Sequence, residues 1–261
     1  MKVRALYVYP VKSGRGVAVR ERDVGPTGLE GDRGFMVVDE HGAFITQREH
    51  PELARLRATL DGATLTLEAD DGRPVAVDRA CAGPEILVEV WGDRVPAVDC
   101  GGPAAGLLTN LTGRLARLVR LTGPRPVDPE YAEPSDTVSF ADAFPLLVAT
   151  TASIEHVARR IERPADARRY RPNIVIEHDE PFAEDAWTEL EIGGVRMALV
   201  KPCSRCSMLD VDPDTGKRDG AVLAGLATLR TDRAKHKVFF GVNAIPRSFG
   251  SIAVGDDARA R

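Results

Sequence analysis

Two cysteines, Cys203 and Cys206, are the residues whose type and spacing are best suited to chemistry. They lie in the segment Lys201-Pro202-Cys203-Ser204-Arg205-Cys206. The thiolate form of cysteine binds metals and attacks electrophiles, and a nearby cation such as Arg205 favours it over the thiol. The segment is therefore a candidate for metal binding or for redox chemistry.

This cysteine pair is compatible with more than one kind of site. A four-cysteine zinc site needs a second closely spaced pair, whereas Cys81 and Cys100 lie 19 residues apart. A thioredoxin-like redox pair should begin a helix, yet residues 210–216 are typical of a strand and a turn. A single thiolate ligand to a soft metal centre fits the local chemistry. From these residues alone, that ligand and a pair of buried structural cysteines both remain open.

The composition of the 261-residue chain limits the classes of protein to consider. With 43% hydrophobic and 28% charged residues, it is typical of a soluble globular protein. A formal net charge of −4 argues against nonspecific binding to nucleic acid or to a membrane surface. No apolar run reaches the roughly 18 residues of a membrane-spanning helix. Four cysteines are too few for a disulfide scaffold, so we expect a reducing, cytoplasmic setting.

Short elements must position the cysteine segment. Runs of alternating apolar and polar residues dominate the first third of the chain, for example at residues 3–9. The pairs Asp61-Gly62 and Asp71-Gly72 supply the positive φ angles that tight hairpins need. Helical spacing of apolar residues predicts helices at residues 104–111 and 151–161. The sequence therefore predicts a mostly β fold with a few helices.

The second half of the chain begins after a proline-rich stretch. Residues 123–135 contain four prolines and predict a connection or a domain boundary. Strand-like runs follow at residues 173–176, 190–192, 195–200 and 237–242. The cysteine segment directly follows the third of these runs.

Nine short segments, in this order, resemble the MOSC family, which is named after the C-terminal domain of molybdenum cofactor sulfurase. The resemblance covers nearly the whole chain and is strongest to the amidoxime-reducing and N-hydroxylaminopurine-reducing molybdoenzymes. The segments are Tyr9-Pro10-Val11-Lys12-Ser13, Gly31-Asp32-Arg33, Val90-Trp91-Gly92-Asp93, Ser139-Phe140-Ala141-Asp142, Tyr170-Arg171-Pro172-Asn173-Ile174-Val175-Ile176, Glu184-Asp185-Ala186-Trp187, Pro202-Cys203-Ser204-Arg205-Cys206, Val211-Asp212-Pro213-Asp214-Thr215-Gly216 and Phe240-Gly241-Val242-Asn243.

The resemblance implies a fold and a cofactor. The fold is an N-terminal β-barrel-like domain, residues 1–122, packed on a β-barrel MOSC domain, residues 123–261. In the similar reductases, molybdenum is held by the dithiolene of a pterin (molybdopterin) and by one cysteine, which corresponds to Cys206, whereas Cys203 matches a position that does not bind the metal. The resemblance implies further contacts to the pterin and its phosphate from Lys12, Ser13, Arg33, Arg171, Asn173, Ser204 and Arg205. Arginine suits this task because its guanidinium carries five N–H donors in a rigid plane.

The activity implied by the resemblance is the reduction of N-hydroxylated compounds by oxygen-atom transfer to molybdenum. Some bacterial relatives append a ferredoxin domain that this chain does not show before Arg261, so we expect electrons from a separate ferredoxin-like protein, flavoprotein or cytochrome. The alternative is a non-catalytic carrier of molybdenum cofactor or of sulfur. Its support comes from two departures from the reductase pattern, Leu209-Asp210 in place of a threonine pair and Ala143-Phe144 in place of cofactor contacts.

Asp210 is the second candidate catalytic residue. It lies four positions after Cys206. A carboxylate near the metal would repel anionic substrates, or donate a proton if its pKa were raised. The alternative is that Asp210 only begins the turn that contains Asp214-Thr215-Gly216.

Overall fold

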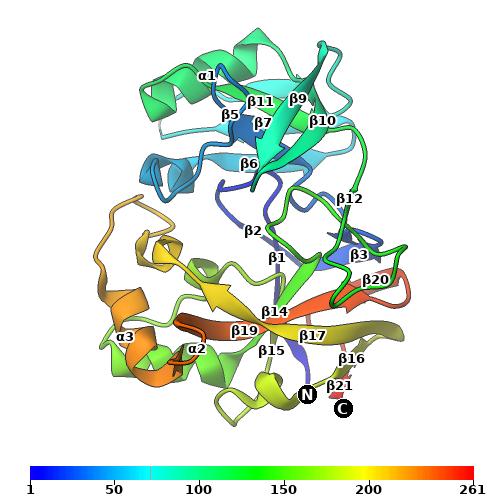
Figure 1. The fold of residues 1–261 in the computed structure, drawn as a ribbon, viewed down its shortest axis with the longest axis vertical. Coiled ribbons are helices and arrows are strands. Elements are labelled where there is room, and N and C mark those ends of the chain that lie inside the picture. The colour runs from blue at the N-terminus through cyan, green and yellow to red at the C-terminus, as the bar shows by residue number, and fades with distance from the viewer. Residues whose placement is uncertain (71) are drawn as a thin grey trace.

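The chain is built mainly from β-strands. The computed structural model describes residues 1–70 and 72–261. These residues form two stacked units, and the larger sheet lies in the lower unit of Figure 1. The predicted mostly β fold is confirmed, with three α-helices in the described residues. None of the helices in these residues is long and apolar enough to cross a membrane.

The larger sheet has nine strands. They are β1 (Val3–Val8), β2 (Val17–Val19), β14 (Leu146–Thr150), β15 (Ile174–Ile176), β16 (Glu189–Ile192), β17 (Val195–Arg205), β18 (Thr231–Asp232), β19 (Lys237–Pro246) and β21 (Ala258–Ala260). Their order is β2-β1-β15-β14-β19-β17-β16-β21, with β18 beside β19. One face of this sheet packs on its own apolar core, which includes Leu6, Val148 and Met197.

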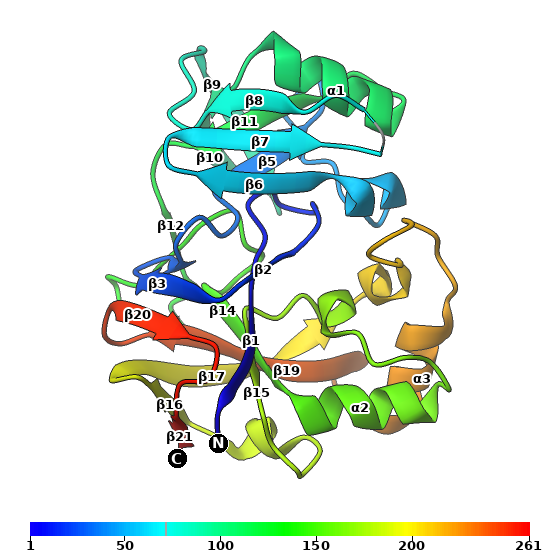
Figure 2. The same cartoon turned by 180° about the vertical axis from the view of Figure 1, so that it is seen from behind.

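The upper unit contains two smaller sheets and one α-helix. Figure 2 shows the sheet of β6, β7 and β8 most clearly. A four-stranded sheet has the order β5-β11-β10-β9, and a three-stranded sheet has the order β6-β7-β8. Their elements are β5 (Phe35–Val38), β6 (Arg57–Asp61), β7 (Thr64–Glu68), β8 (Val75–Asp78), β9 (Glu85–Val90), β10 (Asp93–Asp99), α1 (Gly102–Thr112) and β11 (Arg117–Leu121).

Short elements complete the chain. The strands β3, β4 and β20 form a small sheet, and β12 pairs with β13. Their bounds, with those of the remaining helices, are β3 (Glu21–Gly25), β4 (Gly28–Leu29), η1 (Pro51–Arg55), β12 (Arg125–Pro126), β13 (Thr137–Val138), α2 (Thr151–Arg160), η2 (Ala167–Tyr170), η3 (Ala183–Ala186), η4 (Ser207–Asp210), α3 (Ala221–Arg230) and β20 (Gly250–Ala253), where η marks a 3-10 helix.

Local sequence signals placed several of these elements correctly. The predicted hairpin at Asp61-Gly62 joins β6 to β7, and Gly62 has a φ of 52°. The second hairpin signal includes Asp71, which lies outside the described residues. The two predicted helices are α1 and α2, and the Thr150 side chain accepts a hydrogen bond from the backbone N–H of Ser153 at the start of α2. The helix α3 was not predicted, and the residue before it, Gly220, provides no capping side chain.

The first strand, β1, pairs with a strand that is distant in sequence, β15. Strand β1 pairs with β15, with Ala5 opposite Val175, and the backbone N–H of Tyr7 donates to the carbonyl of Asn173 at 2.9 Å. The chain then leaves the large sheet toward the upper unit (Figure 2). This pairing brings the segment that begins at Tyr9 beside the segment that contains Arg171, although the two are far apart in sequence.

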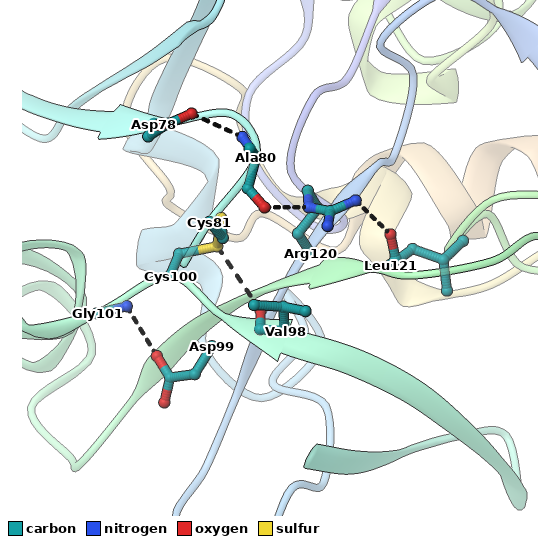
Figure 3. Close-up of a disulfide and its surroundings, with 9 residues drawn as sticks. All are labelled: Asp78, Ala80, Cys81, Val98, Asp99, Cys100, Gly101, Arg120 and Leu121. Carbon is teal, nitrogen blue, oxygen red and sulfur yellow. Dashed lines mark hydrogen bonds between the residues drawn. A yellow bond between two sulfur atoms is a disulfide. The ribbon is translucent and has the colours of Figure 1, made fainter. Parts of the chain in front are cut away.

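A disulfide joins Cys81 to Cys100 in the upper unit (Figure 3). It connects the turn after β8 to the end of β10, where the two Cα atoms lie 4.7 Å apart. The Arg120 side chain supports the same turn, because its Nε donates to the carbonyl of Ala80 at 2.9 Å. The expectation of a reducing setting from the cysteine count did not foresee this bond, because the spacing of two cysteines does not reveal that two strand ends converge.

Candidate functional site

One cavity at the junction of the two units gathers the predicted cofactor-binding residues. Residues from the first third of the chain line one part of it, and residues from β17 and from the segment before β15 line another. All eight of the predicted residues are among those that line it, namely Lys12, Ser13, Arg33, Arg171, Asn173, Ser204, Arg205 and Cys206. The structure therefore brings these residues together, and their binding of a cofactor stays a prediction.

Element ends position these side chains. Arg33 lies in the turn before β5, Arg171 directly follows η2, and Asn173 directly precedes β15. Cys206 follows the end of β17, which extends beyond the predicted run at residues 195–200 as far as Arg205. Cys206 occupies the N-cap position of η4 but makes no side-chain capping hydrogen bond. Ends of elements leave side chains free to point away from a sheet, so the cavity collects polar groups.

The backbone is strained at several positions around the cavity. Ser13, Arg33, Trp91 and Arg171 have φ angles of 63°, 49°, 55° and 55°, and all four line the cavity. Left-handed backbone is uncommon for residues other than glycine and costs free energy that the surrounding structure must offset. Such residues gather at functional sites, so this concentration supports a functional role for the cavity.

Two half-buried arginines differ in how their charge is balanced. Arg33 forms an ion pair with Asp32, whose side chain is fully buried, and its Nη1 also donates to Asn173 Oδ1 at 3.2 Å. Arg171 donates from Nη1 to the carbonyl of Gly14 at 2.7 Å, and no carboxylate in the described chain lies within ion-pair distance of it. Burial, with repulsion from Arg33, lowers the pKa of Arg171 to about 10. Arg171 therefore remains a cation at neutral pH without a carboxylate partner, and an anion in the cavity would balance it.

The charge of Lys12 is already balanced within the protein. Its Nζ pairs with the carboxylate of Asp142 and donates to the carbonyl of Phe140 at 2.8 Å. Burial lowers the pKa of Lys12, and Asp142 partly offsets this effect. Burial alone would raise the pKa of Asp142, but the contact with Lys12 lowers it well below its usual range. A phosphate would therefore have to compete with Asp142 for this ammonium group.

The two cysteines of the segment differ in their surroundings. Cys203 and Cys206 are both free, and Cys206 is exposed. The Nη1 atom of Arg205 lies 3.0 Å from the sulfur of Cys203, and its Nη2 donates to the carbonyl of Tyr170 at 2.7 Å. The sequence suggested that Arg205 favours a thiolate, and the structure directs this guanidinium to Cys203. Cys206 is exposed and lines the cavity, so its thiol is available there as a metal ligand.

Asp210 does not line the cavity, contrary to the expectation that it acts on substrate. Its side chain is 7% exposed, and Oδ1 accepts a hydrogen bond from the backbone N–H of Leu223 at 2.9 Å. Leu223 lies in the first turn of α3, where Gly220 cannot cap the helix. Asp210 therefore takes the part of a capping residue from outside the helix. The turn that was the alternative for Asp210 is instead organised by Asp212, whose Oδ1 accepts from the N–H of Thr215 at 2.9 Å.

Two aromatic side chains, Phe44 and Trp91, belong to the cavity although no role was predicted for them from the sequence. Phe44, Arg48 and Trp91 line the cavity, and the Arg48 guanidinium lies over the Trp91 ring at 4.4 Å. The Nε1 of Trp91 donates to Asp142 Oδ1 at 3.1 Å. The available sequence signal for Trp91 was its position directly before Gly92 in a strand-rich region. Ala143 and Phe144, which depart from the reductase pattern, also line the cavity.

The donor set suits a large anionic cofactor better than a bare metal ion. In the described residues, no group of three or more His, Cys, Asp or Glu side chains could hold a metal ion. The cavity instead offers two free thiols, the half-buried Cys203 and the exposed Cys206, together with the cation Arg171, which has no carboxylate partner in the described chain. These residues fit a phosphorylated cofactor that carries a soft metal with ligands of its own.

Comparison with known families agrees with this arrangement. Residues 1–114 match the family described as "MOSC N-terminal beta barrel domain", and residues 135–259 match the "MOSC domain". The chain belongs to the MOSC family. The predicted domain boundary between residues 122 and 123 lies between the two matches and stays a prediction.

Several relatives are similar over most of the chain. It is 34% identical to human mitochondrial amidoxime-reducing component 1, over 97% of this chain and 81% of that protein. It is 32% identical to the human mitochondrial amidoxime reducing component 2, over 97% of this chain and 82% of that protein. A molybdenum cofactor sulfurase from Danio rerio is 31% identical over 91% of this chain, which corresponds to 31% of that longer protein. These similarities show a MOSC protein related to molybdenum-cofactor proteins.

The expected cytoplasmic location is contradicted by the same comparison. The amidoxime-reducing relatives from human and mouse are named as mitochondrial. The expectation depended on the small number of cysteines, and that number does not distinguish one reducing compartment from another.

Proposed function

We propose that this chain is an oxidoreductase that holds a molybdenum cofactor in the cavity and reduces N-hydroxylated compounds. One observation carries the proposal: the exposed thiol of Cys206 and the half-buried cation Arg171, which has no carboxylate partner in the described residues, line the same cavity. A soft metal favours a thiolate ligand, and a phosphate favours guanidinium donors. The names of the amidoxime-reducing relatives support the reaction, because an amidoxime carries an N–OH group.

Each group of residues has a proposed task. Arg171 and Arg33 would bind the phosphate of the cofactor, and Ser13, Ser204, Arg205 and Asn173 would complete its polar surroundings. Lys12 would add a cation whose contact with Asp142 loosens when the phosphate binds. Cys206 would supply one thiolate ligand. When bound, the cofactor would supply the two-electron chemistry that removes oxygen from an N–O bond.

The chain itself would orient the reactants. Arg33 is held by Asp32 and Asn173, so its guanidinium is already placed before a ligand binds. The aromatic side chains of Trp91 and Phe44 lie against each other, with ring centres 5.1 Å apart, and cover part of the cavity. Because residues 1–122 and 123–261 both contribute, the cofactor would bridge the two proposed domains.

Two further points belong to the proposal. The electrons would come from a separate donor, such as a ferredoxin-like protein, a flavoprotein or a cytochrome. The alternative function is a carrier of the cofactor or of sulfur, which the similarity to molybdenum cofactor sulfurase favours. Turnover separates the two, because a carrier would bind the cofactor and reduce no substrate.

The experiment measures metal and activity together. We expect purified protein loaded with the cofactor to hold about one molybdenum per chain and to reduce benzamidoxime with an artificial reductant. Cys206→Ala should lose the activity and most of the metal, because it removes the proposed ligand. Cys203→Ala is the matched control and should keep its molybdenum. Equal losses in the two variants would point to a two-cysteine site, and full loading without turnover would favour the carrier.

A further inference from the structure

Tyr9 lies behind the cavity and contacts both of the half-buried arginines, Arg33 and Arg171. Its ring is fully buried, so it has no surface from which to contact a ligand. The guanidinium carbon of Arg33 lies 4.5 Å from the centre of the ring, and that of Arg171 lies 4.2 Å from it. Two cations that line the cavity therefore share one aromatic ring.

Tyr9 is also bonded to both chain segments that carry these arginines. Its backbone N–H donates to Asp32 Oδ1 at 2.8 Å, and Asp32 directly precedes Arg33. Its hydroxyl donates to the carbonyl of Pro172 at 3.1 Å, and Pro172 directly follows Arg171. The ring is thus held between two segments that lie about 140 residues apart in sequence.

Close packing keeps the ring in place. A Cβ atom added to Gly16 would lie 2.5 Å from Cε1 of Tyr9, so the glycine backbone passes directly against the ring. No larger residue fits at Gly16 unless the ring moves. This contact offers a way to displace the ring without removing it.

The ring has an electrostatic task that its neighbours do not perform. Two like charges repel strongly in a site of low dielectric constant, and Asp32 forms its ion pair with Arg33 and not with Arg171. The negative face of an aromatic ring attracts a cation, and this attraction is strongest where water is excluded. Burial raises the pKa of the Tyr9 hydroxyl, so the ring stays neutral and serves through its face. Without the ring, Arg171 would have only the Gly14 carbonyl to hold it in place.

We propose that Tyr9 is a positioning residue that holds Arg33 and Arg171 together as a preformed cradle for a doubly charged phosphate group. The proposal rests on the proposed function, because it names the residue that prepares the anion-binding part of that site. Tyr9 acts through the two arginines, since it is buried behind them.

The test compares ring, hydroxyl and packing, with inorganic phosphate and the molybdenum cofactor as separate probes. Tyr9→Phe keeps the ring and should bind phosphate within twofold of the unaltered protein. Tyr9→Leu keeps an apolar side chain and should bind phosphate at least tenfold more weakly. Tyr7→Leu is the control, because Tyr7 is half-buried two positions earlier in the chain and its ring lies over no arginine in the described structure. Calorimetric titration gives the affinities, and thermal unfolding of the cofactor-free variants shows that each is folded.

A purely structural role for Tyr9 predicts a different pattern. It would lower the unfolding temperature of Tyr9→Leu without the difference in phosphate affinity between the leucine and phenylalanine variants. Equal affinities for Tyr9→Leu and the unaltered protein, or equal losses in both Tyr9 variants, would overturn the proposal. If Tyr9→Leu does not fold, Gly16→Ala displaces the ring in an intact chain and should also weaken phosphate binding, and unchanged binding there would overturn it.

The two proposals can fail separately. Suppose that the unaltered protein binds the cofactor, and that Tyr9→Leu binds phosphate as tightly as the unaltered protein does. The proposed function then stands, and the proposed role of Tyr9 is wrong. Unaltered protein that binds neither phosphate nor the cofactor overturns the proposed function and this inference with it.

Discussion

Replacing Arg171 with methionine should make the cofactor-free protein more stable and the cofactor much easier to lose. Arg171 is a half-buried cation with no carboxylate partner in the described chain. Methionine keeps a long unbranched side chain and removes the charge. If Arg171 binds the cofactor and is costly in the empty protein, its replacement should raise the stability of the cofactor-free protein and lower the retention of the cofactor. If Arg171 only supports the fold, its replacement should lower both.

The size of each effect follows from the surroundings of Arg171. A pKa lowered from 12.5 to about 10 corresponds to about 3 kcal/mol that the charge costs the folded chain. Methionine relieves this cost, and its sulfur replaces the attraction of the guanidinium to the Tyr9 ring with an aromatic contact of similar size. It loses the hydrogen bond to Gly14, which is worth about 1.5–3 kcal/mol for a charged donor. We therefore expect a net gain of about 1 kcal/mol, or a rise of about 2–4 °C in the melting temperature. A lost bond to phosphate of about 1.5–3 kcal/mol weakens cofactor retention by roughly 10- to 150-fold.

Two assays on the same protein preparations measure these effects. Calorimetric unfolding of cofactor-free protein gives the stability, and molybdenum and pterin content after dialysis gives the retention. A lysine variant at position 171 keeps the charge and should retain more cofactor than methionine does. A less stable Arg171→Met protein that keeps all of its cofactor would refute the assignment of Arg171 as an unbalanced anion-binding residue.

Three further predictions concern residues around the site. Asp210→Ala should lower the free energy of unfolding by about 1–2 kcal/mol through the lost cap of α3, and altered relative turnover of charged and neutral substrates would contradict this role. Hydrogen bonds from Arg168 depress the pKa of Asp214, so its stabilisation is present above the unfolded pKa of about 3.9 and is lost as pH falls through the lower folded value. Asp214→Asn should therefore cost no more than about 1 kcal/mol at pH 7 and flatten acid unfolding, and an unchanged acid limb would count against it. Cys81→Ser should lower stability by about 2–4 kcal/mol in oxidised protein and by much less with a reductant, and equal losses in both would show that packing dominates over the disulfide.

The sequence by itself determined several of the local elements and eight of the residues that line the cavity. The helix α1 and the hairpin between β6 and β7 follow from apolar spacing and from a glycine that accepts a positive φ, because both signals lie within a few residues. The eight predicted residues, including Arg171 and Cys206, were identified from the family resemblance, because each of them lies in a short motif that can be recognised in one sequence.

Only the tertiary structure decided how those residues are used. The pairing of β1 with β15 places Tyr9 between Arg33 and Arg171, and no local pattern specifies which distant strands will pair. The same holds for Asp210, which caps a helix that lacked a sequence signal. Hydrogen bonds within an element depend on neighbours in sequence, whereas charge balance, burial and the sharing of one ring depend on neighbours in space. That is why the sequence identified the arginines, and only the fold shows which one carries an unbalanced charge.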